Sequence, residues 1–103
     1  MLTIYKYPLV LSESAYAELP IELPQRATFL HMAPSATAHG AMGAIDTWWH
    51  VNTDFASELR VFVVTGTGWE DPLTPRAHLI DVYAGTVVMP DGPVWHVWER
   101  LHR

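Results

Sequence analysis

The stretch GPVWHVWERL, residues 92–101, places two tryptophans, a histidine and a glutamate close together in the sequence. Asp91 precedes this stretch, and the dipeptide Asp91-Gly92 favours a tight hairpin turn, because both residues tolerate positive backbone angles. Pro90 and Pro93 flank this dipeptide and limit the strands on either side of it. The pattern predicts a β-hairpin whose second arm is the quoted stretch.

Each face of this second arm carries one tryptophan, because successive side chains of a strand point to opposite faces. Val94, His96 and Trp98 share one face, and Trp95, Val97 and Glu99 share the other. A strand that is buried on one side only would show a polar face, and this arm shows none. We therefore expect both faces to be covered, by a second layer of the fold or by another subunit.

The rest of the chain contains short runs of β-branched and aromatic residues separated by Gly, Pro, Asn and Asp, which is typical of an all-β protein. Pro8 ends the first run or marks a sheet edge, and Gly85 predicts a bulge or bend. We expect a single domain over residues 1–103 that is all-β, or mainly β with at most one short helix. It would be a small antiparallel sandwich or partly open barrel of about six strands. The expected strands cover residues 2–8, 27–33, 45–51, 58–66, 77–89 and 94–101.

Two segments interrupt these runs. Residues 11–20, LSESAYAELP, predict a short helix with Ser12 as its N-cap. Pro20 and Pro24 lie so close together that we expect no long element to follow the helix directly. Residues 35–44, SATAHGAMGA, have small side chains and predict a surface loop.

The charge balance argues against a duplex nucleic-acid partner. Eleven acidic residues against six basic residues give a net charge of −5, whereas such binders place a basic surface on the phosphates. The acids are scattered, so mimicry of nucleic acid is also disfavoured. Only 17% of the residues are charged, against ~25% in a typical domain. This low fraction favours a homo-oligomer, in which part of the surface is covered by another copy.

The absence of cysteine excludes disulfides, thiolate zinc sites and cysteine nucleophiles. The first residues, MLTIYKYPLV, lack the features of a signal peptide. No apolar run reaches the ~20 residues that a membrane helix needs. We expect a cytoplasmic protein without a membrane partner.

Six histidines raise the question of a metal site, but none are separated by the His-x-His or His-x-x-x-His spacing of metal ligands. We therefore expect neither a metal nor a cofactor. His96 lies between tryptophans, and Glu99 is on the opposite face of the same strand, so these two residues do not form a simple catalytic dyad. The Gly-x-Ser-x-Gly motif of serine hydrolases is absent. No catalytic residue is assigned.

A ligand-binding role has several candidate residues. TGTG, residues 65–68, resembles half of a phosphate-binding loop but lacks the lysine of such loops. A flexible turn is the first interpretation of this segment. Alternatively, its threonine hydroxyls could donate hydrogen bonds to an anion. Lys6 and Arg60, with aromatic residues, could form a receptor for a small anionic or planar ligand. Alternatively, the two cations pair with acids across strands. The candidate residues for a ligand or partner are Tyr5, Lys6, Tyr7, Arg60, Thr65, Thr67, Trp95, His96 and Trp98.

The segments TIYKYPL (3–9), RVFVVTGTG (60–68) and YAGTVVMPDGPVWHVWE (83–99) accompany a tryptophan-containing middle strand. Together they resemble a family of short proteins of uncharacterised function that are encoded mainly by bacteriophages and prophages. The stretch from Ala33 to Ala44 departs from the family pattern. The resemblance implies a phage or bacterial origin and a compact, β-rich accessory protein, and it supplies no catalytic residues.

A small, acidic, cysteine-free phage protein without an enzyme motif most often acts by binding. We expect a non-enzymatic accessory protein, for example a host-defence inhibitor that sequesters a small nucleotide-like ligand in the host cytoplasm. An alternative is a protein-binding inhibitor that meets a host protein through an apolar patch or a strand edge. A third is a small histidine-dependent enzyme, which would need a histidine beside a carboxylate in a cleft.

Overall fold

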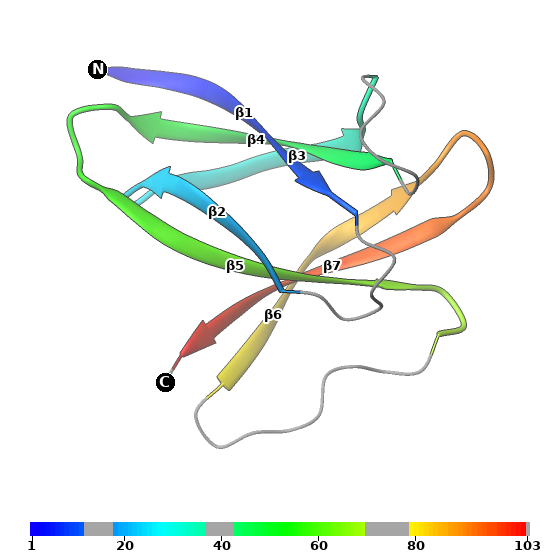
Figure 1. Ribbon diagram of the computed structural model, residues 1–103. Coiled ribbons are helices and arrows are strands. Elements are labelled where there is room, and N and C mark those ends of the chain that lie inside the picture. Colours follow the sequence, from blue (N-terminus) through cyan, green and yellow to red (C-terminus); the bar gives the residue numbers. More distant parts are fainter. Residues whose placement is uncertain (12–17, 37–42, 70–78, 103) are drawn as a thin grey trace.

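Two antiparallel β-sheets pack face to face in the computed structural model (Figure 1). The structure describes residues 1–11, 18–36, 43–69 and 79–102. One sheet has the strand order β1-β4-β3 and the other has the order β2-β5-β7-β6. The strands are β1 (Leu2–Val10), β2 (Glu18–Pro24), β3 (Thr28–Pro34), β4 (Ala44–Asn52), β5 (Ser57–Gly66), β6 (Leu79–Val88) and β7 (Val94–His102).

The architecture is an open sandwich, which confirms the predicted all-β class and decides between a sandwich and a barrel. Each expected strand is present with slightly shifted ends. On one side of the sandwich β1 approaches β2, and on the other side β3 approaches β6. In the part of the chain that the structure describes, no helix is long and apolar enough to cross a membrane.

The strand β2 corrects the last part of the helix predicted over residues 11–20, because from Glu18 onward the chain is extended and pairs with β5. Residues 12–17, with the predicted N-cap serine, lie outside the described residues. Proline is tolerated in an edge strand where its missing N–H would face away from the sheet. Since β2 is an edge strand, Pro20 and Pro24 lie within it instead of breaking it.

The structure also tests the predictions for Pro8 and for the loop over residues 35–44. Pro8 lies inside β1, which continues to Val10 at a sheet edge, so the edge interpretation is confirmed and the strand-end interpretation is wrong. Of the loop predicted over residues 35–44, residues 37–42 lie outside the described residues. Ala44, at the end of that segment, already belongs to β4.

The predicted terminal hairpin joins β6 to β7 through residues 89–93. The backbone N–H of Met89 donates to the carbonyl of Pro93 at 2.8 Å, and Gly92 has a φ of 115°. The hairpin is confirmed, but its turn is wider than a two-residue Asp-Gly turn. Pro90 and Pro93 lack the N–H groups that would extend the ladder into the turn.

Gly85 lies at a β-bulge in β6, as its position in the sequence predicts. The register passes from Tyr83 opposite Trp98 to Gly85 opposite Val97, so Ala84 is the additional residue of the bulge. A Cβ atom at position 85 would lie 3.2 Å from a methionine sulfur of β3. The glycine therefore also lets β6 approach β3 closely.

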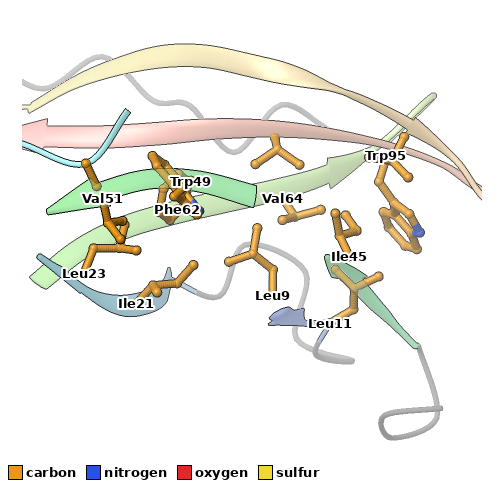
Figure 2. Packing of buried hydrophobic residues seen from close by; sticks show 13 residues of the cluster. Leu9, Leu11, Ile21, Leu23, Ile45, Trp49, Val51, Phe62, Val64 and Trp95 are labelled. Carbon is orange, nitrogen blue, oxygen red and sulfur yellow. The ribbon is translucent and has the colours of Figure 1, made fainter. Parts of the chain in front are cut away.

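The core lies between the inner faces of the two sheets, and Trp49 of β4 is one of its largest members (Figure 2). Its ring meets the rings of Phe29 and Phe62 edge-on at 5.2 and 5.8 Å. The indole N–H of Trp49 donates to Thr47 Oγ1 at 2.8 Å, and that hydroxyl donates to the carbonyl of Tyr7 at 2.7 Å. The polar group of this buried side chain is therefore satisfied.

The predicted alternation along the second hairpin arm is confirmed. Trp95 and Val97 of β7 are buried in the core beneath the three-stranded sheet. His96 and Trp98 lie on the outer face of the four-stranded sheet and are half-buried. The inner face of the arm is therefore fully covered, and its outer face keeps part of an aromatic surface open to solvent.

Candidate functional site

The structure divides the predicted binding residues among separate places. Tyr5 and Tyr7 point to the inner face of β1, and Lys6 points to its outer face. Arg60 lies on the inner face of the four-stranded sheet, with its guanidinium 4.7 Å from the ring centre of Trp49. The three-stranded sheet thus lies between Lys6 and Arg60. A single receptor that combines these two cations with the tyrosines and the terminal tryptophans is not formed.

Arg60 pairs with Glu99 in a two-pronged arrangement. The Nε and Nη2 groups of Arg60 donate to the two carboxylate oxygens at 2.6 and 2.7 Å, and Nη1 donates to the carbonyl of Ala27 at 2.7 Å. The hydrogen bond with Glu99 raises the pKa of Arg60, although burial opposes it. This confirms the alternative prediction that Arg60 pairs with an acid from another strand.

Lys6 and Arg100, which also lie in the sheets, pair with acidic side chains as well. Lys6 Nζ lies 3.8 Å from a carboxylate oxygen of Asp46, which is buried in β4. Arg100 pairs with Asp81 at 2.9 Å and with Glu18 at 3.2 Å. These charges therefore serve the fold, and a ligand would compete with acids for each of them.

Four polar side chains form a cluster on the outer face of the four-stranded sheet. Thr67 Oγ1 lies 2.6 Å from His96 Nε2. On the other side of the imidazole, Tyr83 Oη and Thr86 Oγ1 lie 3.0 and 3.2 Å from His96 Nδ1 and hydrogen-bond to each other. We call Thr67, Tyr83, Thr86 and His96 the hydroxyl–imidazole cluster. Both ring nitrogens of His96 thus have hydroxyl partners at the protein surface.

The bulge in β6 assembles this cluster. Tyr83 and Thr86 are three positions apart, so in a regular strand their side chains would point to opposite faces. The additional residue Ala84 restores a common face, and the register then places Thr86 opposite His96. Tyr83 and Thr86 were not among the predicted binding residues, although the bulge glycine and the hairpin register together point to them.

Aromatic rings border the cluster. The ring of Trp98 meets that of Tyr83 edge-on at 5.1 Å and lies 6.2 Å from that of His96. Tyr83 is half exposed, so the surface offers both a ring and a hydroxyl to solvent. Thr65, opposite His96 in the register, is buried and does not extend the exposed surface.

A pocket of about 250 Å³ opens beside the cluster. Two of its lining residues are Trp69 and Trp95, whose indole rings are perpendicular with centres 5.2 Å apart. Thr67 belongs both to this pocket and to the hydroxyl–imidazole cluster. The Trp69–Trp95 pocket is lined by Gly66, Thr67, Trp69, Pro93, Val94 and Trp95.

The TGTG segment forms a turn, as its glycines predict, and this turn builds the pocket wall. Gly68 has a φ of 85°, and the backbone N–H of Trp69 donates to the carbonyl of Gly66 at 3.1 Å. The turn folds the ring of Trp69 back over Gly66, where an added Cβ atom would lie 2.8 Å from the indole. Trp69 was not among the predicted binding residues, because its contacts depend on this turn.

Trp95 differs from Trp49 in one respect. Both are buried tryptophans of the core, but the indole N–H of Trp95 has no hydrogen-bond acceptor among the described residues. Figure 2 shows this nitrogen on the side of the ring that faces away from Ile45 and Leu9. The predicted binding residue Trp95 therefore belongs to the core and contributes to the candidate site as a lining residue of the pocket.

The chemistry available at this site is hydrogen bonding and aromatic stacking. His96 contacts hydroxyl groups and no carboxylate within the described ranges. Nor do three or more histidine, aspartate or glutamate residues come together there as metal ligands. The arrangement is suited to holding a flat, polar molecule.

The chain matches a family model described as a Domain of unknown function (DUF7352) over residues 1–103. No curated protein and no solved structure matches it. Because the family model spans the full sequence, the chain belongs to the DUF7352 family.

Proposed function

We propose that the protein is a non-enzymatic binding module that captures a small planar ligand at the end of the four-stranded sheet. The observation that carries this proposal is the position of Thr67. Its hydroxyl lies 2.6 Å from His96 Nε2, and the same residue lines the Trp69–Trp95 pocket. Polar groups that fix orientation and rings that stack therefore meet at one place, as they do in small-molecule sites.

The charge distribution supports recognition through the ring of the ligand. Arg60, Arg100 and Lys6 are each paired with a carboxylate, so each is a weak candidate for a phosphate ligand. Hydroxyls and a histidine remain at the site, and these groups donate and accept hydrogen bonds. A nucleotide-like ligand would thus be held mainly by its base, with aromatic stacking worth ~1–3 kcal/mol per base.

The resemblance to phage-encoded proteins gives this binding a biological setting. We propose that the captured molecule is a nucleotide-like signal of host defence, which the protein sequesters in the host cytoplasm. Sequestering needs tight binding and no turnover, which agrees with a histidine whose partners are hydroxyl groups. Replacing His96 with Asn is then expected to tune affinity, whereas in a histidine-dependent enzyme it would abolish turnover.

The first test is native mass spectrometry of the protein purified from a bacterial host, followed by denaturing release of any bound molecule. We expect a small-molecule mass that is lost in Trp98→Ala and retained in Trp48→Ala. Trp48 is a matched control, because it is a half-buried tryptophan on the three-stranded sheet. Retention of the ligand by a folded Trp98→Ala protein would contradict the proposal.

Binding to a host protein is a second candidate, favoured by the surface of β1. Leu2, Ile4 and Val10 point outward from this edge strand and are 65%, 58% and 46% exposed. An exposed strand edge with apolar side chains suits strand addition by a partner. Here Ile4→Lys would abolish binding to the host protein and Trp98→Ala would leave it intact, so the two variants separate the two functions.

A further inference from the structure

One residue that lines the Trp69–Trp95 pocket has a hydrogen-bond donor that is unpaired among the described residues. The indole N–H of Trp95 is buried and has no acceptor in the described part of the chain. A buried donor without a partner is destabilising, and folded proteins satisfy nearly all such groups. In the same core the indole N–H of Trp49 has an acceptor at 2.8 Å, so this fold can pair a buried indole N–H with a side chain of its own. Trp95, the residue that carries this unpartnered donor, is also one of the residues that line the pocket beside the cluster.

The size of the pocket limits what can enter it. Its volume of about 250 Å³ lies just below the ~300–1,000 Å³ of sites for drug-sized ligands. One flat ring system fits that space, and a complete nucleotide does not. The indole rings, Pro93 and Val94 make most of the lining apolar, and a charged group placed there would lose its hydration.

We propose that this pocket binds an uncharged N-heteroaromatic ring, whose ring nitrogen accepts the hydrogen bond of Trp95 Nε1–H. The proposal rests on the proposed function and specifies its ligand class. The ring lies in the pocket against the indoles of Trp69 and Trp95, which already contact each other edge-on. Any polar or charged remainder of the ligand leaves the pocket past Thr67 toward His96. An aromatic ring without an acceptor fills the same space but leaves the donor of Trp95 unpaired.

Gly66 controls one wall of this pocket. Because an added Cβ atom would lie 2.8 Å from the Trp69 indole, any side chain at position 66 must displace that ring. Gly66→Ala thus removes the stacking wall while leaving Trp95 and its N–H in place. Trp95→Phe does the opposite, since it keeps an aromatic ring and removes the donor.

The experiment compares isoquinoline with naphthalene, which have the same shape and differ by one ring nitrogen. Each is titrated into ¹⁵N-labelled protein at equal concentrations, and the indole N–H signals of the five tryptophans are followed by NMR. Trp95→Phe identifies the Trp95 signal by its loss. We expect isoquinoline to shift the Trp95 N–H signal downfield and to bind about tenfold more tightly than naphthalene. Trp95→Phe should abolish this preference, and Gly66→Ala should weaken both ligands by about tenfold or more.

The outcomes separate the two proposals. If isoquinoline shifts the signals of His96 and Trp98 but not that of Trp95, the pocket inference fails and binding at the cluster stands. If both ligands bind equally and Trp95→Phe changes nothing, the role of the Trp95 donor is refuted. If neither ligand shifts any of these signals, the inference and the planar-ligand function both fail.

Discussion

Tyr7 lies half-buried on the inner face of β1, where its ring meets that of Tyr5 edge-on at 6.2 Å. Its backbone carbonyl accepts the hydrogen bond of Thr47, which in turn accepts from the buried indole of Trp49. Burial raises the pKa of the Tyr7 phenol above its usual value of 10.0, and the neighbouring Tyr5 raises it further. The folded state therefore favours the neutral form of the Tyr7 phenol over the phenolate.

This shift predicts a loss of stability at alkaline pH. As pH rises through about 10, the unfolded chain releases the Tyr7 proton first, because its pKa is the lower one. The folded state then holds more protons, so the free energy of unfolding falls with rising pH. Tyr7→Phe should make this fall shallower in urea unfolding curves recorded from about pH 9 to about pH 11. Identical pH dependence in the two proteins would contradict the assignment.

The β6–β7 hairpin is the element that assembles the candidate site. Its bulge at Ala84 brings Tyr83 and Thr86 to the face of His96, and Gly85 beside it permits close contact with β3. The nearest atoms to an added Cβ atom at position 85 belong to the side chain of Met32, at 3.2 and 3.4 Å. A flexible methionine can move by the small distance that a methyl group requires.

We therefore predict different effects for two substitutions of Gly85. Gly85→Ala should change the free energy of unfolding by less than ~1 kcal/mol, because the displacement of Met32 offsets the lower entropy of the unfolded alanine chain. Gly85→Val should lower it by ~1–3 kcal/mol, since the larger side chain overpacks the space between β6 and β3. Chemical denaturation measures both values. Equal effects of the two variants would show that Met32 does not limit this position.

At the scale of the whole molecule, the Arg60–Glu99 pair joins parts that are distant in sequence. The guanidinium extends from β5 to β7, to the chain before β3 and to the ring of Trp49 in the opposite sheet. The side chains of Arg60 and Glu99 are only 21% and 15% exposed. The guanidinium of this pair therefore links the two sheets through its contact with the ring of Trp49.

Removal of the Glu99 charge should destabilise the fold. Glu99→Gln leaves a half-buried guanidinium without its anion, and breaking a fully buried pair costs ~3–5 kcal/mol. We expect a loss of about 2 kcal/mol in the free energy of unfolding, because this pair is partly exposed. Asp81→Asn is the matched control: Arg100 keeps Glu18 at 3.2 Å, so its loss should be smaller. Equal losses would show that the link between the sheets adds no stability.

The local pattern of the sequence determined six of the seven strands that the structure describes, all except β2, and the terminal hairpin. Alternation with a period of two and the Asp91-Gly92 turn act within a few residues, so they can be read without knowledge of neighbouring strands. The opposite orientations of Trp95 and His96 followed from the same alternation. The resemblance to phage-encoded proteins adds an expectation about origin, which stays a prediction.

The tertiary structure alone decided which of these side chains meet. The prolines of β2 are compatible with a strand because β2 lies at an edge, and strand order is not visible in a local pattern. Pairing partners decided that Arg60 binds Glu99 instead of a ligand. The hydroxyl–imidazole cluster and the Trp69–Trp95 pocket depend on the register across the Ala84 bulge and on the turn before Trp69. Such non-local contacts arise only when the whole chain has packed, because a shift of one residue in register would turn every side chain of the strand to the other face.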